Sequence, residues 1–128
     1  MSQLGVRYSW GGGNANGPTV GVREGGVADS SGDYYSVGFD CSGLTMYAYA
    51  GVGVMLPHFS GYQYTSGAQV PTSQMQPGDL IFYGPGGTEH MSMYLGNGKM
   101  IESPESGSVV KISPIRYGGI TAYVTRLL

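Results

Sequence analysis

Phe39-Asp40-Cys41-Ser42-Gly43-Leu44 is the stretch around which the rest of this sequence is organised. It contains the only cysteine among the 128 residues, so this cysteine has no disulfide partner within the chain. An aspartate before the cysteine is typical of a helix start, and residues at helical spacing follow it, at Leu44, Tyr47, Ala48 and Ala50. We therefore predict that Cys41 lies in the first turn of a helix over residues 41–52, ended by Gly51 and Gly53.

That position makes Cys41 a candidate nucleophile. The first turn of a helix presents unpaired backbone N–H groups and the positive end of the helix dipole, both of which favour a thiolate. Most free cysteines, however, are small buried apolar residues. The spacing alone leaves both interpretations open.

The composition indicates a single domain that is rich in turns. The chain has 24 glycines, and charged residues make up 11% of it, against about 25% in typical domains. This predicts tight turns between short strands, and the low charge suits a secreted or cell-surface protein. A net charge of −2 without a basic run excludes the electrostatic signature of a nucleic-acid binder. No apolar run approaches the roughly eighteen residues of a membrane helix.

The first residues, Met1-Ser2-Gln3-Leu4-Gly5, do not resemble a signal peptide. If the protein acts outside the cytoplasm, we expect its export signal on a segment that this chain does not include. The chain would then be a single domain excised from a longer secreted precursor, and we expect it to be a monomer.

The remaining pattern predicts an α+β fold. Residues 13–38 are rich in Gly, Asn, Ser and Asp and predict a long surface loop, and a second short helix is expected at about 59–67. From Pro77 onward, alternating apolar residues and turn signals predict about five antiparallel strands, at residues 79–83, 90–95, 100–102, 109–112 and 122–127. Helices followed by strands are the order of an α+β domain with its helix packed on one face of the sheet.

A cysteine nucleophile needs a base, and the base needs a group that orients it. The chain has two histidines, His58 and His90. His90 begins a predicted strand, from which it can face the start of a helix packed on the sheet, so it is the better-placed base. His58 follows a proline at a helix entrance and is expected on the surface or rim.

Glu102 is the candidate orienting group, and the turn between its strand and that of His90 decides whether it can reach. A two-residue Asn97-Gly98 turn would send the carboxylate to the opposite face from His90. A three-residue Gly96-Asn97-Gly98 turn, with its last glycine left-handed in a bulge, pairs Ser92 with Glu102 and brings His90 and Glu102 to one face. Only the second arrangement allows a Cys41–His90–Glu102 triad.

Metal and phosphate sites are weakly indicated. Asp29-x-Ser31-x-Asp33 resembles the start of a calcium loop, but Tyr34 stands where that loop needs glycine. One cysteine and two distant histidines cannot form a zinc site, and Gly11-Gly12-Gly13 lacks the lysine of a phosphate-binding loop. We expect neither a metal nor a cofactor.

Four blocks of the sequence together resemble the NlpC/P60 family of bacterial cell-wall cysteine peptidases. They occur in the family's order and span most of the chain, at residues 5–12 (GVRYSWGG), 39–44 (FDCSGL), 76–83 (QPGDLIFY) and 90–102 (HMSMYLGNGKMIE). The long segment before the cysteine makes the chain most similar to the mycobacterial Rip endopeptidases. Two residues depart from the family's usual pattern, since Glu102 stands where the family often has histidine and Arg7 where it often has proline.

The resemblance implies a papain-like α+β fold and hydrolysis of stem-peptide amide bonds in peptidoglycan. The bond is typically the one between the γ-carboxyl of D-glutamate and a diamino acid such as meso-diaminopimelate. By resemblance, Cys41 is the nucleophile, His90 the general base and Glu102 the third polar residue. The resemblance also places three residues on the oxyanion and substrate side, Tyr8, Asp40 and Ser42.

Two other functions fit the same motifs: an N-acetylmuramoyl amidase or acyltransferase on this fold, and a non-catalytic peptidoglycan-binding module. A pure binder needs neither the cysteine nor the histidine, so the intact pair favours an enzyme. The loop over residues 13–38 joins the Tyr8 block to the nucleophile, and we expect it to line or cover the substrate groove. Arg23, its only cation, is either a partner for a stem-peptide carboxylate or a solvated surface residue.

Overall fold

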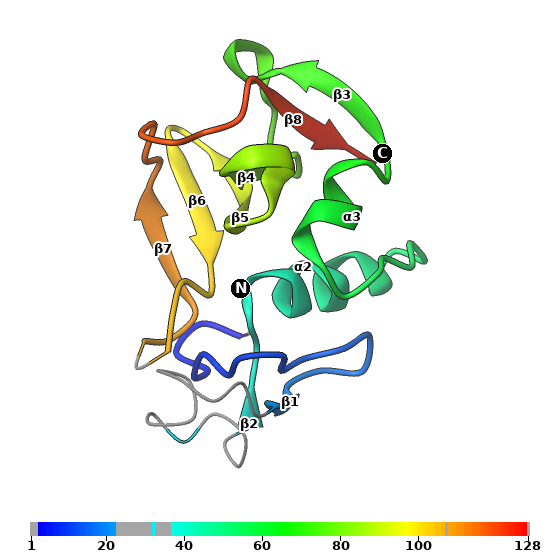
Figure 1. Cartoon of the computed structure of the whole chain (residues 1–128), viewed down its shortest axis with the longest axis vertical. Coiled ribbons are helices and arrows are strands. Elements are labelled where there is room, and N and C mark those ends of the chain that lie inside the picture. Colours follow the sequence, from blue (N-terminus) through cyan, green and yellow to red (C-terminus); the bar gives the residue numbers. More distant parts are fainter. Residues whose placement is uncertain (1–2, 23–31, 33–36, 107, 128) are drawn as a thin grey trace.

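The computed structural model describes residues 3–22, 32, 37–106 and 108–127. Its largest element is a six-stranded antiparallel sheet, with helix α2 beside it and a small two-stranded ribbon at the far end of the molecule (Figure 1). The sheet has the order β3 (Ala68–Pro71), β8 (Tyr123–Arg126), β4 (Leu80–Tyr83), β5 (His90–Gly96), β6 (Lys99–Glu102) and β7 (Lys111–Pro114). The helices are α2 (Cys41–Ala50) and α3 (Ser60–Tyr64), with 3-10 turns η2 (Thr72–Gln74) and η3 (Pro85–Gly87).

The α+β class predicted from the sequence is confirmed, and the differences lie in the strands. The sheet has six strands rather than about five, because β3 was not expected; its exposed residues show no apolar alternation. Strand β8 lies between β3 and β4, so the sheet is not a simple meander. Strand β7 begins at Lys111, two residues later than predicted. Within the described residues, no helix is long and apolar enough to cross a membrane.

Helix α2 starts where the sequence predicts. Asp40 precedes it with extended backbone, and its carboxylate accepts a hydrogen bond of 2.7 Å from the backbone N–H of Gly43. This is the standard way in which an aspartate satisfies an unpaired donor at a helix start. The helix ends at Ala50, and Gly51 follows it as the C-cap. Cys41 is therefore fixed as the first residue of the helix.

The two faces of the sheet carry separate apolar cores. One core joins α2 to the sheet through Leu80, Phe82 and Met91, with Tyr49 contributed by the helix. The opposite face buries a second set, made of Ile81, Tyr83, Met100 and Val124. Because side chains alternate along a strand, His90 lies on the second face, where its ring contacts that of Tyr83.

The position of His90 therefore differs from the expectation in one respect. It was expected on the face that packs against the helix, and it lies instead at the first residue of β5, on the other face. The backbone N–H of the next residue, Met91, hydrogen-bonds Cys41. The helix start and the strand start thus meet at the same end of the sheet, and this brings the cysteine close to the histidine's strand.

The β5–β6 hairpin has the predicted register but reaches it by a different turn. Gly96 pairs with Lys99, so the turn has two residues, Asn97 and Gly98, both with positive φ (55° and 73°). Of the two turns that the sequence left open, the two-residue turn forms, and the expectation that this turn would send Glu102 to the opposite face from His90 is wrong. A bulge at Leu95 restores the register, since the pairs resume as Tyr94 with Met100 and Met93 with Ile101. Continued by one residue, this register places Ser92 opposite Glu102, on the face of His90.

The segment before the helix is not wholly a loop. Within residues 13–38, strand β1 (Thr19–Val20) pairs with β2 (Val37–Gly38) to form the two-stranded ribbon. The sequence gives no alternation there, because two-residue strands are too short to show any. Arg23 and the Asp29–Asp33 segment of the weak calcium pattern lie outside the described residues, apart from Gly32.

Candidate active site

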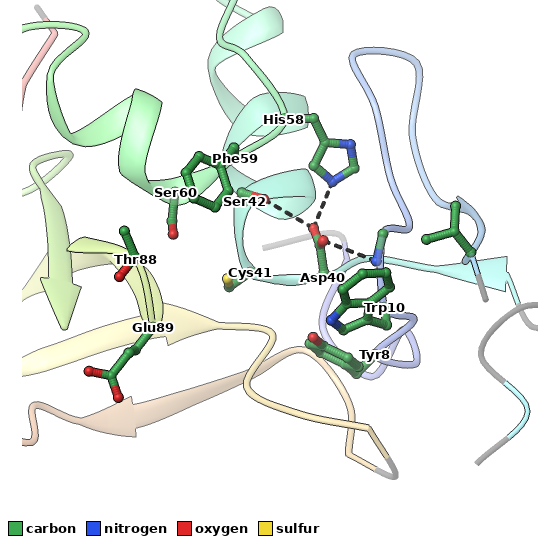
Figure 2. A pocket seen from close by; sticks show the side chains of 12 residues that line it. Tyr8, Trp10, Asp40, Cys41, Ser42, His58, Phe59, Ser60, Thr88 and Glu89 are labelled. Atoms are coloured by element: carbon green, nitrogen blue, oxygen red, sulfur yellow. Dashed lines mark hydrogen bonds and ion pairs between the residues drawn. The ribbon is translucent and has the colours of Figure 1, made fainter. Parts of the chain in front are cut away.

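Cys41 lines a pocket of about 480 Å³ at the start of α2. Figure 2 shows the sulfur at the centre of this pocket, with aromatic side chains on two sides of it. Tyr8, Asp40 and Ser42, which the sequence placed beside the nucleophile, all line the same pocket. The other lining residues are Trp10, Gly11, Val22, His58, Phe59, Ser60, Thr88 and Glu89.

The thiol of Cys41 is protonated in the free protein. Burial raises its pKa to about 12, and the neighbouring Asp40 carboxylate contributes to this rise. Hydrogen bonds from the backbone N–H groups of Met91, Ser42 and Cys41 itself act in the other direction and do not compensate. The backbone N–H groups at the helix start thus favour a thiolate, as the sequence indicates, but burial and the Asp40 charge outweigh them. A thiol with so high a pKa could act as a nucleophile only with a proton acceptor beside it.

His90 is held by Glu102 across the two neighbouring strands. The Nε2 atom of His90 lies 2.8 Å from Oε1 of Glu102, as the shared face of β5 and β6 predicts. This contact leaves Nδ1 as the ring atom that is free of the carboxylate. The orienting role expected for Glu102 therefore has the geometry that it needs.

Glu102 is fully buried and is held by more than the histidine. Arg116 donates two hydrogen bonds to it, of 2.6 and 2.8 Å, and Ser113 donates a third. Burial by itself would raise the pKa of Glu102, but these hydrogen bonds and the one to His90 hold that pKa well below its usual range. The carboxylate is thus ionised at neutral pH.

Sequence reasoning missed Arg116. It follows β7 and lies 14 residues beyond Glu102, with no motif to connect the two. Tyr83 contacts Arg116 in two ways. Its hydroxyl donates a 2.7 Å hydrogen bond to the Arg116 carbonyl, and the centre of its ring lies 5.8 Å from the guanidinium carbon. The same ring makes a T-shaped contact with the ring of His90. These contacts link His90, Glu102 and Arg116 into one network.

Asp40 connects a second histidine to the nucleophile. Its carboxylate accepts from the backbone N–H of Gly11 at 3.1 Å, from the Ser42 hydroxyl at 3.3 Å and from Nε2 of His58 at 2.8 Å, as the dashed lines in Figure 2 show. The hydrogen bond to Asp40 raises the pKa of His58. His58 is thus on the rim, as expected, but with a defined partner that the sequence did not reveal. The Ser42 hydroxyl thus hydrogen-bonds the carboxylate that caps the helix.

The profile of the NlpC/P60 family matches residues 5–128. The chain is 56% identical to the peptidoglycan endopeptidase RipA of Mycolicibacterium smegmatis, over the whole of this chain and 24% of that protein. It therefore spans about a quarter of the length of this relative. The similarity therefore concerns only that part of RipA.

Solved structures of the resuscitation promoting factor interacting protein RipA have the same fold. One of them superimposes with a TM-score of 0.91 at 52% identity, over 98% of this chain and 57% of that one. Three such structures are mutated at a cysteine, a histidine and a glutamate, which are 49 and 12 positions apart in that protein. Cys41, His90 and Glu102 have the same separations.

A further structural relative is RipD from Mycobacterium tuberculosis, with a TM-score of 0.87 at 46% identity over 99% of this chain and 90% of that one. It is described as a non-catalytic NlpC/p60 domain protein adapted to peptidoglycan binding. The fold therefore carries both catalysts and binders, and the choice between them depends on the side chains of the site.

Proposed function

This chain belongs to the NlpC/P60 family, and from that premise we propose that it is a cysteine endopeptidase that hydrolyses stem-peptide amide bonds of peptidoglycan. The bond we propose joins the γ-carboxyl of D-glutamate to meso-diaminopimelate. We further propose that the enzyme acts as a monomer at the cell wall, outside the cytoplasm. The observation that carries the proposal is the hydrogen bond between His90 and Glu102, because His90 begins the strand whose next backbone N–H, that of Met91, contacts the pocket-lining Cys41.

The reaction starts with a proton transfer, because the raised pKa keeps Cys41 as a thiol in the free enzyme. Nε2 of His90 is occupied by Glu102, so Nδ1 is the atom that accepts the proton. The imidazolium that forms is stabilised by the ionised Glu102 carboxylate. In this scheme Glu102 orients the base and stabilises its charged form without taking up a proton.

The thiolate sulfur then attacks the carbonyl carbon, and the π electrons of the carbonyl move onto its oxygen. The backbone N–H groups of Cys41 and Ser42 at the helix start are the donors for this oxyanion, with Tyr8 beside them. Collapse of the intermediate breaks the C–N bond, and His90 gives its proton to the leaving amine. A water molecule, activated by the neutral imidazole, then hydrolyses the thioester and restores the thiol.

Two observations favour catalysis over a pure binding role. The fully buried carboxylate, with four hydrogen bonds from its neighbours, is costly to maintain unless its charge has a use. The cysteine, histidine and glutamate also have the separations of the residues mutated in RipA. An amidase or an acyltransferase on this fold would use the same three groups, so the products must decide among these activities.

The test is digestion of purified sacculi with the protein and with its Cys41→Ala variant, followed by mass spectrometry of the soluble products. The proposal predicts fragments with a free amino group on diaminopimelate, and no fragments with the variant. Intact stem peptides that begin at L-alanine would indicate an amidase, and new amide bonds would indicate a transferase. Sedimentation of the unaltered protein with intact sacculi, without released fragments, would indicate a binding module.

A further inference from the structure

Gln63 in helix α3 is a fully buried polar side chain that takes no part in the proposed reaction. Its Nε2 donates to the carbonyl of Ser42 at 3.0 Å and to the carbonyl of Pro57 at 2.7 Å. Its Oε1 accepts a 2.6 Å hydrogen bond from the hydroxyl of Thr45. The two carbonyls can only accept and the hydroxyl can donate, so this orientation of the amide satisfies all three partners at once.

Two of these partners lie directly behind opposite walls of the pocket that Cys41 lines. Ser42 comes directly after Cys41, and Pro57 comes directly before residues 58–60; Ser42 and residues 58–60 all line this pocket (Figure 2). The amide of Gln63 therefore joins the wall that carries the nucleophile to the wall at the start of α3. The width of the pocket between these walls depends on both hydrogen bonds.

Thr45 extends the connection to the strand of the general base. Its hydroxyl is buried and has three acceptors within reach: Oε1 of Gln63 at 2.6 Å, the carbonyl of Ser42 at 3.0 Å and the sulfur of Met91 at 3.7 Å. A hydroxyl has one hydrogen, so the shortest contact, the one to Gln63, sets its direction. Met91 is the second residue of β5, and its backbone N–H hydrogen-bonds Cys41. Gln63 is thus connected to the nucleophile from the sheet as well as from the helix.

We propose that Gln63 is a positioning residue for the hydrolysis. It holds the first turn of α2, and with it the sulfur of Cys41, at a fixed place relative to the opposite pocket wall and to the strand of His90. A displacement of about 1 Å at a reacting group can lower a rate about 100-fold, whereas substrate binding draws on contacts over the whole pocket. Loss of the Gln63 amide should therefore act on kcat more than on KM. The inference rests on the proposed function, because hydrolysis is its main readout.

Thr125 provides the matched control for a purely structural role. It is fully buried, and its hydroxyl donates a 2.6 Å hydrogen bond to the carbonyl of Tyr64, in the same helix as Gln63. It lies on β8, which β4 separates from β5. Thr125→Val therefore removes a buried hydrogen bond to α3 without touching the connection to Cys41, so it should lower the Tm and leave kcat within about twofold of wild type.

The first test compares Gln63→Met with Thr125→Val in thermal unfolding and in hydrolysis of L-alanyl-γ-D-glutamyl-meso-diaminopimelate. Methionine is similar in size to glutamine and makes none of the three hydrogen bonds. Gln63→Met should lower kcat about 10-fold to 100-fold, with less than about a threefold change in KM. A lowered Tm with a wild-type kcat, or a loss confined to KM, would overturn the positioning role.

The second test uses Gln63→Glu, which keeps the shape of the side chain and also serves if Gln63→Met does not fold. A carboxylate cannot donate to the carbonyls of Ser42 and Pro57, but a protonated carboxyl has one O–H donor. Burial beside two carbonyl oxygens raises the pKa of such a carboxyl above its usual range. The kcat of Gln63→Glu relative to wild type should therefore rise as pH falls from about 9 to about 6. A ratio that stays constant or falls would contradict the proposal.

If the wild-type protein does not cleave the tripeptide, the proposed function fails, and alkylation of Cys41 by iodoacetamide tests Gln63 separately. Release of the first turn of α2 exposes the buried thiol, so Gln63→Met should react at least about threefold faster than wild type at the same pH. Thr125→Val should react at the wild-type rate. Equal rates in all three proteins would refute the role of Gln63 in holding the nucleophile.

Discussion

Gly43→Ala should displace the nucleophile, because the third residue of α2 lies directly on the backbone of the N-terminal segment. A methyl group on Gly43 would lie 2.1 Å from the carbonyl oxygen of Gly12 and 2.9 Å from Oδ1 of Asp40. Neither atom is the flexible end of a long side chain, so the helix start must move by about 1 Å to reach van der Waals distance. A displacement of about 1 Å at a reacting group can lower a rate about 100-fold.

The magnitude of the stability loss follows from the same contact. Overpacking of this kind costs about 1–3 kcal/mol, and for a domain of this size we expect a fall in Tm of about 4–12 °C. Gly51→Ala, at the other end of the helix, is the matched control. Gly51 has a φ of −64°, and its added methyl group would lie 3.4 Å from the nearest atom, so this variant should be neutral or more stable by about 0.4–1 kcal/mol.

The loss of stability is measured by thermal unfolding. The loss of activity is measured, on the same preparations, by hydrolysis of the tripeptide L-alanyl-γ-D-glutamyl-meso-diaminopimelate (the diaminopimelate tripeptide). The expected pattern is a large loss of kcat/KM and a lower Tm for Gly43→Ala, with neither change for Gly51→Ala. A wild-type Tm together with a wild-type kcat/KM for Gly43→Ala would refute the close packing of the helix start against the backbone of Gly12. A loss of activity in both variants would show that helix α2 tolerates no added methyl group and that the contact is not specific.

Three further predictions concern the ionisable groups. His90→Ala should abolish hydrolysis in a folded protein, whereas His58→Ala should retain most of it, and equal losses in steady-state assays would leave the base unassigned. Arg116→Met should lower kcat with little change in KM, because Glu102 loses two of the hydrogen bonds that hold it against His90, and Arg116→Lys should restore part of kcat. A wild-type kcat in Arg116→Met would exclude this positioning role. The pKa of His58 is raised in the folded protein, so its pairing with Asp40 stabilises the fold fully below the unfolded-state pKa of about 6.5, and this stabilisation is lost as pH rises through the folded-state pKa. Urea titrations should therefore show that His58→Gln lowers the free energy of unfolding at about pH 5.5 and changes it little at about pH 9. The opposite dependence on pH would contradict the ion pair.

The sequence allows the helix start and the strand pairing to be predicted because both depend on local rules. Asp40 before Cys41 is a helix cap, and Asn97-Gly98 is a hairpin turn. The bulge at Leu95 could not be predicted, since an extra residue in a strand leaves the alternation unchanged on either side of it. The turn and the bulge nevertheless produce the register that the triad requires.

The electrostatic partners of the site follow from tertiary packing and leave no trace in sequence spacing. Arg116 meets Glu102 only after β7 has been placed beside β6, and His58 meets Asp40 only after the chain has turned back from α2. The raised pKa of Cys41 could not be predicted from the sequence for a related reason. A helix start favours a thiolate, but burial and the Asp40 charge depend on the folded surroundings and outweigh it.

The most direct test of the central claim is capture of the acyl-enzyme. The diaminopimelate tripeptide is mixed with the protein, the reaction is quenched with acid within milliseconds to seconds, and the intact protein and its fragments are analysed by mass spectrometry. The account predicts a covalent L-alanyl-γ-D-glutamyl adduct on the peptide that contains Cys41, absent from the Cys41→Ala variant, which should also release no diaminopimelate. Release of diaminopimelate by the folded Cys41→Ala variant would contradict the account.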